Sequence, residues 1–256
     1  MQRQASDPRY DELWEDVYGQ IQAVGPTHRH LRRLLGKQLA ELDYRTVVDV
    51  GCGAGDNAAL LRRRGGVERL VGLDVSTAAL ERARACDREG EYELLDIERG
   101  ALGGTFDLVF SSLLLEHLPD DRAALRNMRA MTGRHLLVAT MAGDFERYRA
   151  WDEQVGHVRN YARGELERRL AEAGFEVERT VYWGFPLYSP LMRRLQNRTR
   201  ATAHLGAGAR LAAALLYPLF FLNSSRRGDL LIALASPRSP RSAVPAMESS
   251  SVQDGA

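Results

Sequence analysis

Cysteine and lysine are both scarce in this chain of 256 residues, and its apolar runs are short. The two cysteines, Cys52 and Cys86, do not make a disulfide framework. The apolar stretch 211–222 holds twelve residues and an internal proline, whereas a helix that crosses a bilayer needs about 20. Residues 1–12 are polar and charged, unlike a secretory signal, so the cytoplasm is the expected compartment.

The charges are balanced in number but uneven in kind. Lys37 is the only lysine among 35 basic residues, an imbalance that indicates codon bias in a GC-rich, bacterial genome. A net charge of +1 creates no global field toward nucleic acid, and no basic aromatic strip is visible, so no nucleic-acid partner is expected. The length fits one α/β domain with additions, and 45% hydrophobic residues can form a real core.

The chain is organised around a strand, a glycine-rich turn and a helix at residues 46–58. The β-branched run Thr46–Val50 reads as a buried parallel strand, and Gly51, Gly53 and Gly55 follow it. These glycines let the backbone approach a ligand closely, and the helix that follows favours an anionic group. In the dinucleotide pattern of nicotinamide oxidoreductases the third glycine falls at position 56, which here is Asp56, and this disfavours that class.

Strands and helices alternate from residue 46 to 140, which predicts a doubly wound parallel sheet. The strand Arg69–Val75 contains Asp74, which is placed to accept the ribose hydroxyls of a bound nucleoside, and Ser76 caps the next helix. The other expected strands are 92–97, 106–111, 135–140, 175–183 and 229–235; the expected helices include 10–24, 27–42, 163–173 and one ending near 131, and 143–161 is expected to be an irregular loop over the site.

Several segments together resemble the class I S-adenosylmethionine-dependent methyltransferases, in the group that includes the ubiquinone and menaquinone methylases. The segments are Val-Asp-Val-Gly-Cys-Gly-Ala-Gly at 48–55, Gly-Leu-Asp-Val-Ser at 72–76, Leu-Asp-Ile at 95–97, Phe-Asp-Leu-Val-Phe-Ser-Ser at 106–112, Glu-His-Leu-Pro at 116–119 and Ala-Gly-Phe at 173–175. The resemblance implies a seven-stranded, mostly parallel sheet in the order 3-2-1-4-5-7-6, with S-adenosyl-L-methionine as cofactor and a small or lipophilic acceptor.

The resemblance also implies a role for each matching position. It places Asp49, Gly51, Cys52, Gly53 and Gly55 around the methionine part of the cofactor, Asp74 on the ribose and Val75 against the adenine. It places Asp96 and Ile97 at the adenine amino edge, and Ser111 and Ser112 near the methionine amino group. The Asn/Asp-Pro-Pro-Tyr/Phe stretch of some enzymes of this fold is replaced by Ser-Ser-Leu-Leu at 111–114, which favours O- or C-methylation over N-methylation.

Two histidines are candidates for the catalytic work, which is mainly to hold the acceptor in line and exclude water. His117 follows the fourth strand, and His157 lies in the loop before the last helix. Either can act as a base toward the acceptor. The alternatives are a helix-entry hydrogen bond for His117 and loop capping for His157. No group of His, Cys or Asp has the spacing of metal ligands, so no metal is expected.

The sequence divides into helices at 1–45 on the substrate side, a core at 46–186, an insertion at 187–228, a last strand at 229–235 and a disordered tail at 236–256. The insertion has seven arginines, no acidic residue and the apolar stretch. It is expected to form helices that contact the inner membrane face peripherally or cover a lipid-like acceptor. A buried helix and a dimer contact are the alternatives. A non-catalytic module that binds S-adenosylmethionine and acts through this surface is the alternative function.

Overall fold

The computed structural model describes residues 8–13, 25–63, 65–200 and 206–238. The helix expected over 10–24 lies mostly outside the described residues; its start is seen as α1, Pro8–Leu13. Most of the tail predicted to be disordered also lies outside them.

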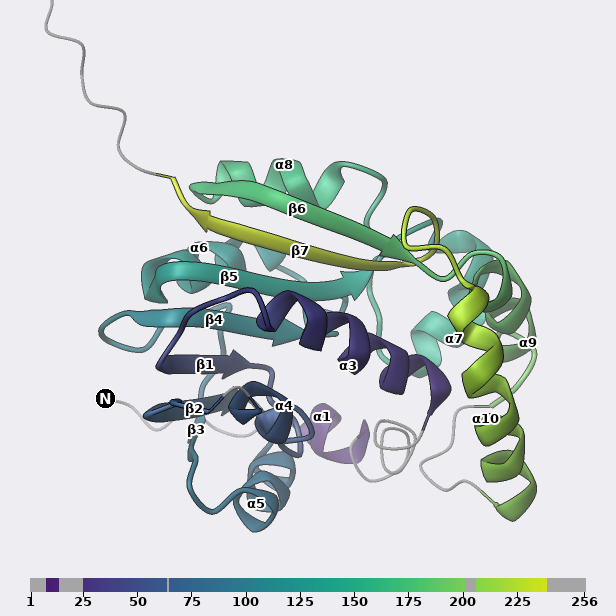
Figure 1. Ribbon diagram of the computed structural model, residues 1–256, viewed down its shortest axis with the longest axis horizontal. Helices are drawn as coiled ribbons and strands as arrows, with labels where there is room; N and C mark the ends of the chain where they lie inside the picture. The colour runs from purple at the N-terminus through teal and green to yellow at the C-terminus, as the bar shows by residue number, and fades with distance from the viewer. Residues whose placement is uncertain (1–7, 14–24, 64, 201–205, 239–256) are drawn as a thin grey trace, which may run out of the picture.

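A seven-stranded sheet forms the centre of the molecule, in the order β3-β2-β1-β4-β5-β7-β6 (Figure 1). β7 pairs antiparallel with both β5 and β6, and the other neighbouring pairs are parallel. The predicted fold class, strand order and reversed seventh strand are therefore confirmed. The strands are β1 Thr46–Val50, β2 Arg69–Asp74, β3 Glu91–Leu94, β4 Phe106–Ser112, β5 Thr132–Met141, β6 Phe175–Trp183 and β7 Leu230–Pro237.

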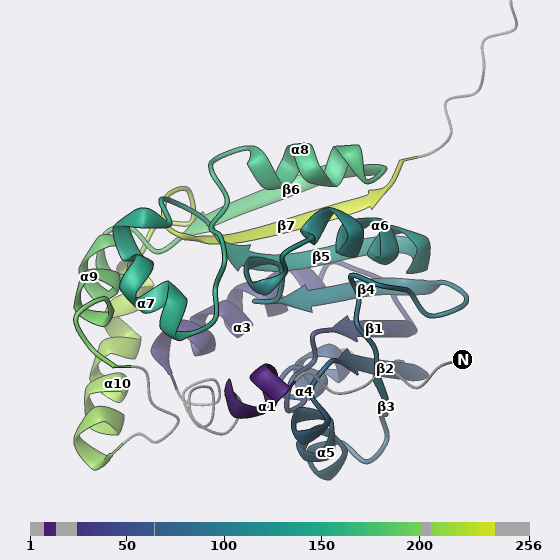
Figure 2. The same ribbon diagram turned by 180° about the vertical axis from the view of Figure 1, so that it is seen from behind.

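Helices cover both faces of the sheet because each presents an apolar stripe to it. On one face lie α3, Pro26–Leu39, α4, Ala58–Arg62, and α5, Thr77–Cys86. The other face carries α6, Asp121–Met131, and α8, Glu165–Glu172, which lie in front of the sheet in Figure 2. The layers leave the carboxyl ends of the parallel strands uncovered by these helices, the edge where open α/β sheets bind ligands.

Several boundaries differ from the sequence-based expectation by a few residues, and two of the differences bear on the site. The third strand ends at Leu94, so residues 95–97 lie beyond it, in the segment that leads into a turn at 97–99. The loop 143–161 is not wholly irregular, since it contains a single helical turn, η3 Glu146–Tyr148, and the short helix α7, Arg149–Gln154. Arg149 pairs with acidic side chains three residues before it and four residues after it, the spacing at which helical side chains meet.

Helices form most of the described part of the insertion. They are η4 Leu187–Met192, α9 Arg193–Gln196, α10 Ala207–Leu219 and η5 Phe220–Leu222. α10 packs beside the start of α3 at one end of the sheet (Figure 1), where Nε2 of His30 lies 2.8 Å from the carbonyl oxygen of Tyr217. None of the described helices has both the length and the apolar character needed to cross a membrane.

Candidate functional site

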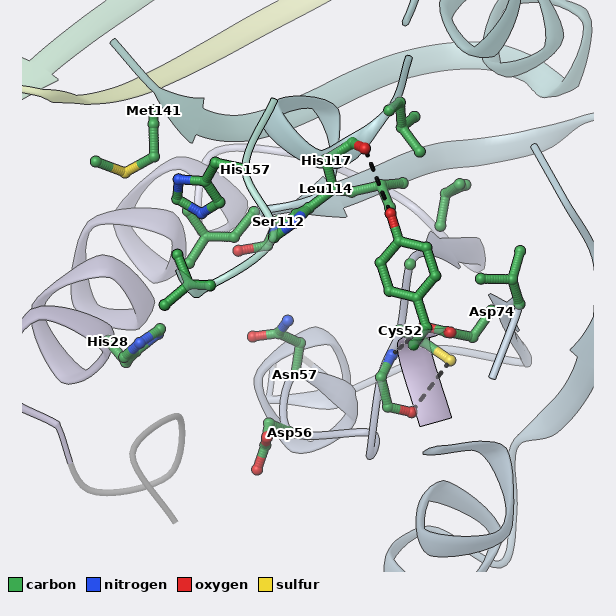
Figure 3. Close-up of a pocket in the computed structure, with 18 of the residues that line it drawn as sticks. His28, Cys52, Asp56, Asn57, Asp74, Ser112, Leu114, His117, Met141 and His157 are labelled. Atoms are coloured by element: carbon green, nitrogen blue, oxygen red, sulfur yellow. Dashed lines mark hydrogen bonds between the residues drawn. The ribbon is translucent and has the colours of Figure 1, made fainter. Parts of the chain in front are cut away.

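A cavity of about 670 Å³ opens at the carboxyl ends of β1, β2 and β4. The glycine turn, the ends of β2 and β4, residues 151–157 and the insertion all contribute to its wall. Figure 3 shows Asp74 and Cys52 on one side of it and His117, His157 and Met141 on another. The cavity therefore joins the predicted cofactor residues to both predicted catalytic histidines in one space.

The glycine turn brings bare backbone to the cavity wall. Gly51, Gly53 and Gly55 all have positive φ angles, +73°, +55° and +80°, which side chains other than glycine rarely adopt. The N–H groups of Gly51 and Cys52 donate to the carbonyl oxygen of Leu73, at 2.8 and 3.0 Å, and fix the turn to β2. A Cβ atom on Gly51 would lie 2.9 Å from the Leu114 side chain, so the position has no room for one.

Asp74 holds the turn and also lines the cavity. Its Oδ2 accepts a hydrogen bond from the N–H of Gly53 at 2.9 Å, and its Oδ1 accepts one from the N–H of Ser76 at 3.0 Å. Burial raises the pKa of this carboxyl, although the backbone N–H groups oppose that shift. Each carboxylate oxygen can accept a second hydrogen bond, so Asp74 can serve the turn and a ligand together.

The predicted cofactor residues divide into two groups. Those that line the cavity are Gly51, Cys52, Gly53, Asp74, Val75, Asp96, Ile97 and Ser112. Three others lie behind the wall: Asp49 is buried, Gly55 lies close to Ala83, and the hydroxyl of Ser111 donates to the carbonyl oxygen of Val50 at 2.9 Å. The individual roles implied for all of these residues stay predictions.

Asp49 is a buried carboxyl within β1, next to the last residue of the strand. It is 2% exposed, and its Oδ1 has no hydrogen-bond partner in the structure. Burial, followed by the nearby charges of Asp74 and Asp56, raises its pKa to about 8. A cationic group nearby would stabilise the ionised form of Asp49 and lower its pKa.

At the other end of the cavity the two histidines meet. The ring centroids of His117 and His157 are 4.7 Å apart, edge to face. Nδ1 of His117 lies 3.0 Å from the carbonyl oxygen of Gly156, and the N–H of Val158 donates to the carbonyl oxygen of Glu116 at 2.8 Å. These two bonds hold residues 156–158 against the segment that follows β4, so both candidate bases face one space.

Glu116 lies beside the histidines, fully buried, and joins them in a cluster. Its Oε2 accepts a hydrogen bond from the Thr140 hydroxyl at 2.7 Å, whereas its Oε1 has no partner in the structure. Burial raises the pKa of Glu116, and the charge of His157 acts in the opposite direction. One ligand atom from each of Glu116, His117 and His157 lies within 4.8 Å of the other two. Sequence spacing did not predict this cluster, because His157 is 40 residues away along the chain.

The insertion reaches the site through Arg193. Its guanidinium is 1% exposed and lies 2.6 and 2.7 Å from the two carboxylate oxygens of Asp152, and 3.3 Å from Asp229. Burial alone would raise the pKa of Asp152, but the contacts with His157 and Arg193 lower it overall. No local pattern in the sequence links residues 152 and 193, so this pair could not be predicted from it.

Other lining residues were also missed. Tyr10 lines the cavity and donates to the carbonyl oxygen of His117 at 3.3 Å. His28, Asp56 and Asn57 lie along a further side, and burial lowers the pKa of His28 to about 4. The apolar part of the wall is formed by Leu113, Leu114, Met141, Trp151, Val155, Tyr188, Met192 and Leu230.

The chain is similar to known methyltransferases in sequence and in structure. A family profile described as a methyltransferase domain matches residues 20–180. The trans-aconitate 2-methyltransferase of Azoarcus sp. is 30% identical over 155 residues, which cover 60% of this chain and 59% of that protein. The chain thus spans about three fifths of the length of this curated relative.

Solved structures share the fold. A putative sarcosine dimethylglycine methyltransferase from Galdieria sulphuraria has a TM-score of 0.59 at 13% identity, and covers 91% of this chain and 98% of its own. The magnesium protoporphyrin IX methyltransferase of Synechocystis PCC 6803, solved with S-adenosylmethionine bound, has a TM-score of 0.54 at 16% identity, with 91% and 90% covered. The predicted fold and family are confirmed: this chain belongs to the methyltransferase domain family, whose cofactor is S-adenosyl-L-methionine.

Proposed function

We propose that the protein transfers the methyl group of S-adenosyl-L-methionine to an oxygen or carbon atom of a small, largely apolar acceptor. The observation that supports this most is the single cavity, which reaches from Asp74 past the glycine turn to His117 and His157. When bound, the cofactor supplies a methyl group that its sulfonium has already activated. The work left to the protein is to align the two reactants about 3–3.5 Å apart and to exclude water.

The residues at the first end fit this cofactor. Gly51 offers backbone where a Cβ would collide with Leu114, and Asp74 offers carboxylate oxygens suited to two ribose hydroxyls. The unpartnered Oδ1 of buried Asp49 would stabilise positive charge at the methionine end. Asp96 and Ile97 lie in the segment that follows β3 and line the cavity, where the adenine edge is proposed to lie.

The other end favours an acceptor with an apolar body. Its wall is mostly leucine, methionine, valine and aromatic side chains. The relative from Azoarcus is named for trans-aconitate, a polycarboxylate. Here the buried guanidinium of Arg193 is already bound to Asp152 and Asp229, so it is not available to a ligand carboxylate. We therefore propose an acceptor with one oxygen-bearing group at the histidines and an apolar remainder.

His117 and His157 are the proposed proton acceptors for that group. A neutral imidazole can take a proton from a hydroxyl as the new bond forms. His117 uses Nδ1 toward the Gly156 carbonyl, so its other nitrogen carries the lone pair needed for this role.

Turnover with a panel of acceptors tests the proposal. S-adenosyl-L-homocysteine should form with medium-chain fatty acids or hydroxylated aromatic compounds, and faster than with trans-aconitate. Replacing His157 by glutamine should lower kcat while leaving cofactor affinity unchanged. If the protein binds S-adenosylmethionine but gives no product with acceptors or cell extracts, the non-catalytic binding module is the better account.

The exposed leucines of α10 support a second proposed partner, a lipid surface. Leu211, Leu215 and Leu219 lie at helical spacing on α10 and are 63%, 63% and 50% exposed. Seven arginines and no acidic residue accompany them in residues 187–228. Apolar insertion together with about 1 kcal/mol for each basic residue near anionic lipid would support reversible docking on such a surface.

Flotation with vesicles tests this partner. Wild-type protein should float with anionic vesicles and less with neutral ones. The double substitution Leu211→Ser and Leu215→Ser should abolish flotation. If the protein stays unbound to both and is a dimer that the same substitutions dissociate, the surface is a contact between two copies of the chain.

A further inference from the structure

We infer that Glu116, His117 and His157 form a binding site for a divalent transition-metal ion at the acceptor end of the cavity. Two imidazoles and one carboxylate are the ligand set of catalytic zinc sites and of many iron and manganese sites. Their ligand atoms lie within 4.8 Å of one another, compared with about 3–4 Å around a shared ion, so small side-chain rotations suffice. Metal binding at this site does not depend on the proposed methyl transfer. Only the role of the ion in catalysis rests on that proposed function.

Glu116 provides the first argument. Its carboxylate is fully buried, yet Oε1 has no hydrogen-bond partner among the described residues, while Oε2 accepts a hydrogen bond from the Thr140 hydroxyl. A buried, unpartnered carboxylate oxygen is costly unless a cation or donor meets it. The imidazole of His157 lies in the same cluster, and its charge acts on Glu116. A divalent ion shared by the three residues would satisfy Oε1.

The histidines provide the second argument, through their outer contacts. Histidines that bind metals usually give their other ring N–H to a backbone carbonyl or a carboxylate, which fixes the ring and the tautomer. His117 has its Nδ1 3.0 Å from the carbonyl oxygen of Gly156. Nδ1 of His157 lies 3.4 Å from Oδ1 of Asp152, an ionic contact without a hydrogen bond. In the His117 ring Nδ1 faces a carbonyl oxygen, which places the lone pair of the neutral ring on Nε2.

The Asp152 carboxylate is itself held in place. It receives two contacts from Arg193 and a hydrogen bond of 2.9 Å from the amide of Asn160. Glu116 and His117 thus have a hydrogen-bond partner behind them, a hydroxyl and a carbonyl, and His157 has the fixed Asp152 carboxylate within ionic contact. Within the described part of the chain no other group of this kind occurs.

An ion at this position would have a clear use. His117 and His157 line the cavity, so open coordination positions would face the acceptor. A divalent ion lowers the pKa of a hydroxyl that it contacts, which favours the deprotonated, nucleophilic form. With the ion bound, the two imidazoles would act as its ligands, and the ion would replace them as the group that promotes loss of the hydroxyl proton. It would also orient the single polar group of an otherwise apolar acceptor.

Metal binding is measured directly, without cofactor or acceptor. Protein treated with a chelator and then desalted is titrated with Co²⁺, followed by visible absorption, and with Zn²⁺, followed by equilibrium dialysis and elemental analysis. We expect one equivalent per chain. His157→Ala and Glu116→Gln should each weaken binding at least tenfold and remove the visible cobalt bands.

His28→Ala is the matched control, because His28 lines the same cavity but stands outside the cluster. It should bind cobalt as wild type does. Thermal unfolding shows whether each variant is folded, and His157→Asn replaces His157→Ala if the latter is not. Less than a tenth of an equivalent in wild type, or equal binding by wild type and the folded cluster variants, overturns the inference.

Calorimetry with S-adenosyl-L-homocysteine on the chelated protein separates this result from the proposed function. Cofactor binding without metal binding leaves methyl transfer standing and rejects the metal site. Metal binding without cofactor binding supports the metal site and rejects the proposed methyl transfer.

Discussion

Replacing Gly51 by alanine should damage the cofactor end of the cavity in a way that a matched variant does not. Gly51 has a φ angle of +73°, and Gly65 has the same angle. An alanine at either position carries the left-handed backbone cost, about 1–2 kcal/mol. At Gly65 an added Cβ meets nothing within 4 Å, whereas at Gly51 it lies 2.9–3.1 Å from three atoms of Leu114.

The difference between the two variants therefore isolates the collision. Overpacking of this kind costs roughly 1–3 kcal/mol more, and Leu114, which lines the cavity, has to move. Chemical unfolding should show a similar small loss for Gly65→Ala and a larger loss for Gly51→Ala. Calorimetry should show that only Gly51→Ala loses affinity for S-adenosylmethionine, by tenfold or more. Equal affinity in the two variants would refute the close approach of cofactor to this turn.

Three further predictions concern charged and polar side chains. Asp74→Asn should weaken binding of S-adenosylmethionine by roughly 2–4 kcal/mol in calorimetry, because charge-assisted hydrogen bonds are lost; normal affinity would exclude a ribose contact. The pKa of Asp49 is raised from 3.8 to about 8, so its contribution to stability is full below pH 4 and is lost as the pH rises to 8. Asp49→Asn should remove that loss, about 1.4 kcal/mol per pH unit at most, in unfolding experiments between pH 5 and 8; an unchanged slope would show that Asp49 is ionised in the fold. The pKa of His30 is lowered, chiefly by burial, so its contribution is present above its ordinary value of 6.5 and is lost as the pH falls. His30→Phe should flatten the decrease in melting temperature below pH 6.5, and an unchanged decrease would exclude His30 as its cause.

The fold and the cofactor end were predictable because their signals are local. The run Thr46–Val50 and the glycines after it specify a buried strand and a turn within ten residues. Ser76 is adjacent to the helix that it caps, and its hydroxyl oxygen accepts the N–H of Ala79 at 3.1 Å as expected. Such features depend on neighbouring residues, and the sheet only brings them together.

The acceptor end was only partly predictable because its contacts join distant segments. His117 and His157 were identified singly, but their meeting depends on residues 156–158 docking beside β4. The pair between Asp152 and Arg193 spans 41 positions and crosses from the core to the insertion. The third strand was expected to extend to Ile97, but it ends at Leu94 because it pairs with the distant strand β2 only over residues 91–94.

Calorimetric titration of the wild-type chain with S-adenosyl-L-homocysteine, with NADH as the comparison ligand, tests the central claim most directly. The structure predicts one molecule of S-adenosyl-L-homocysteine per chain, bound far more weakly by Gly51→Ala than by Gly65→Ala, and no binding of NADH. Binding of NADH in its place, or no heat with S-adenosyl-L-homocysteine from folded protein, would contradict the assignment of this cavity to the methyl donor.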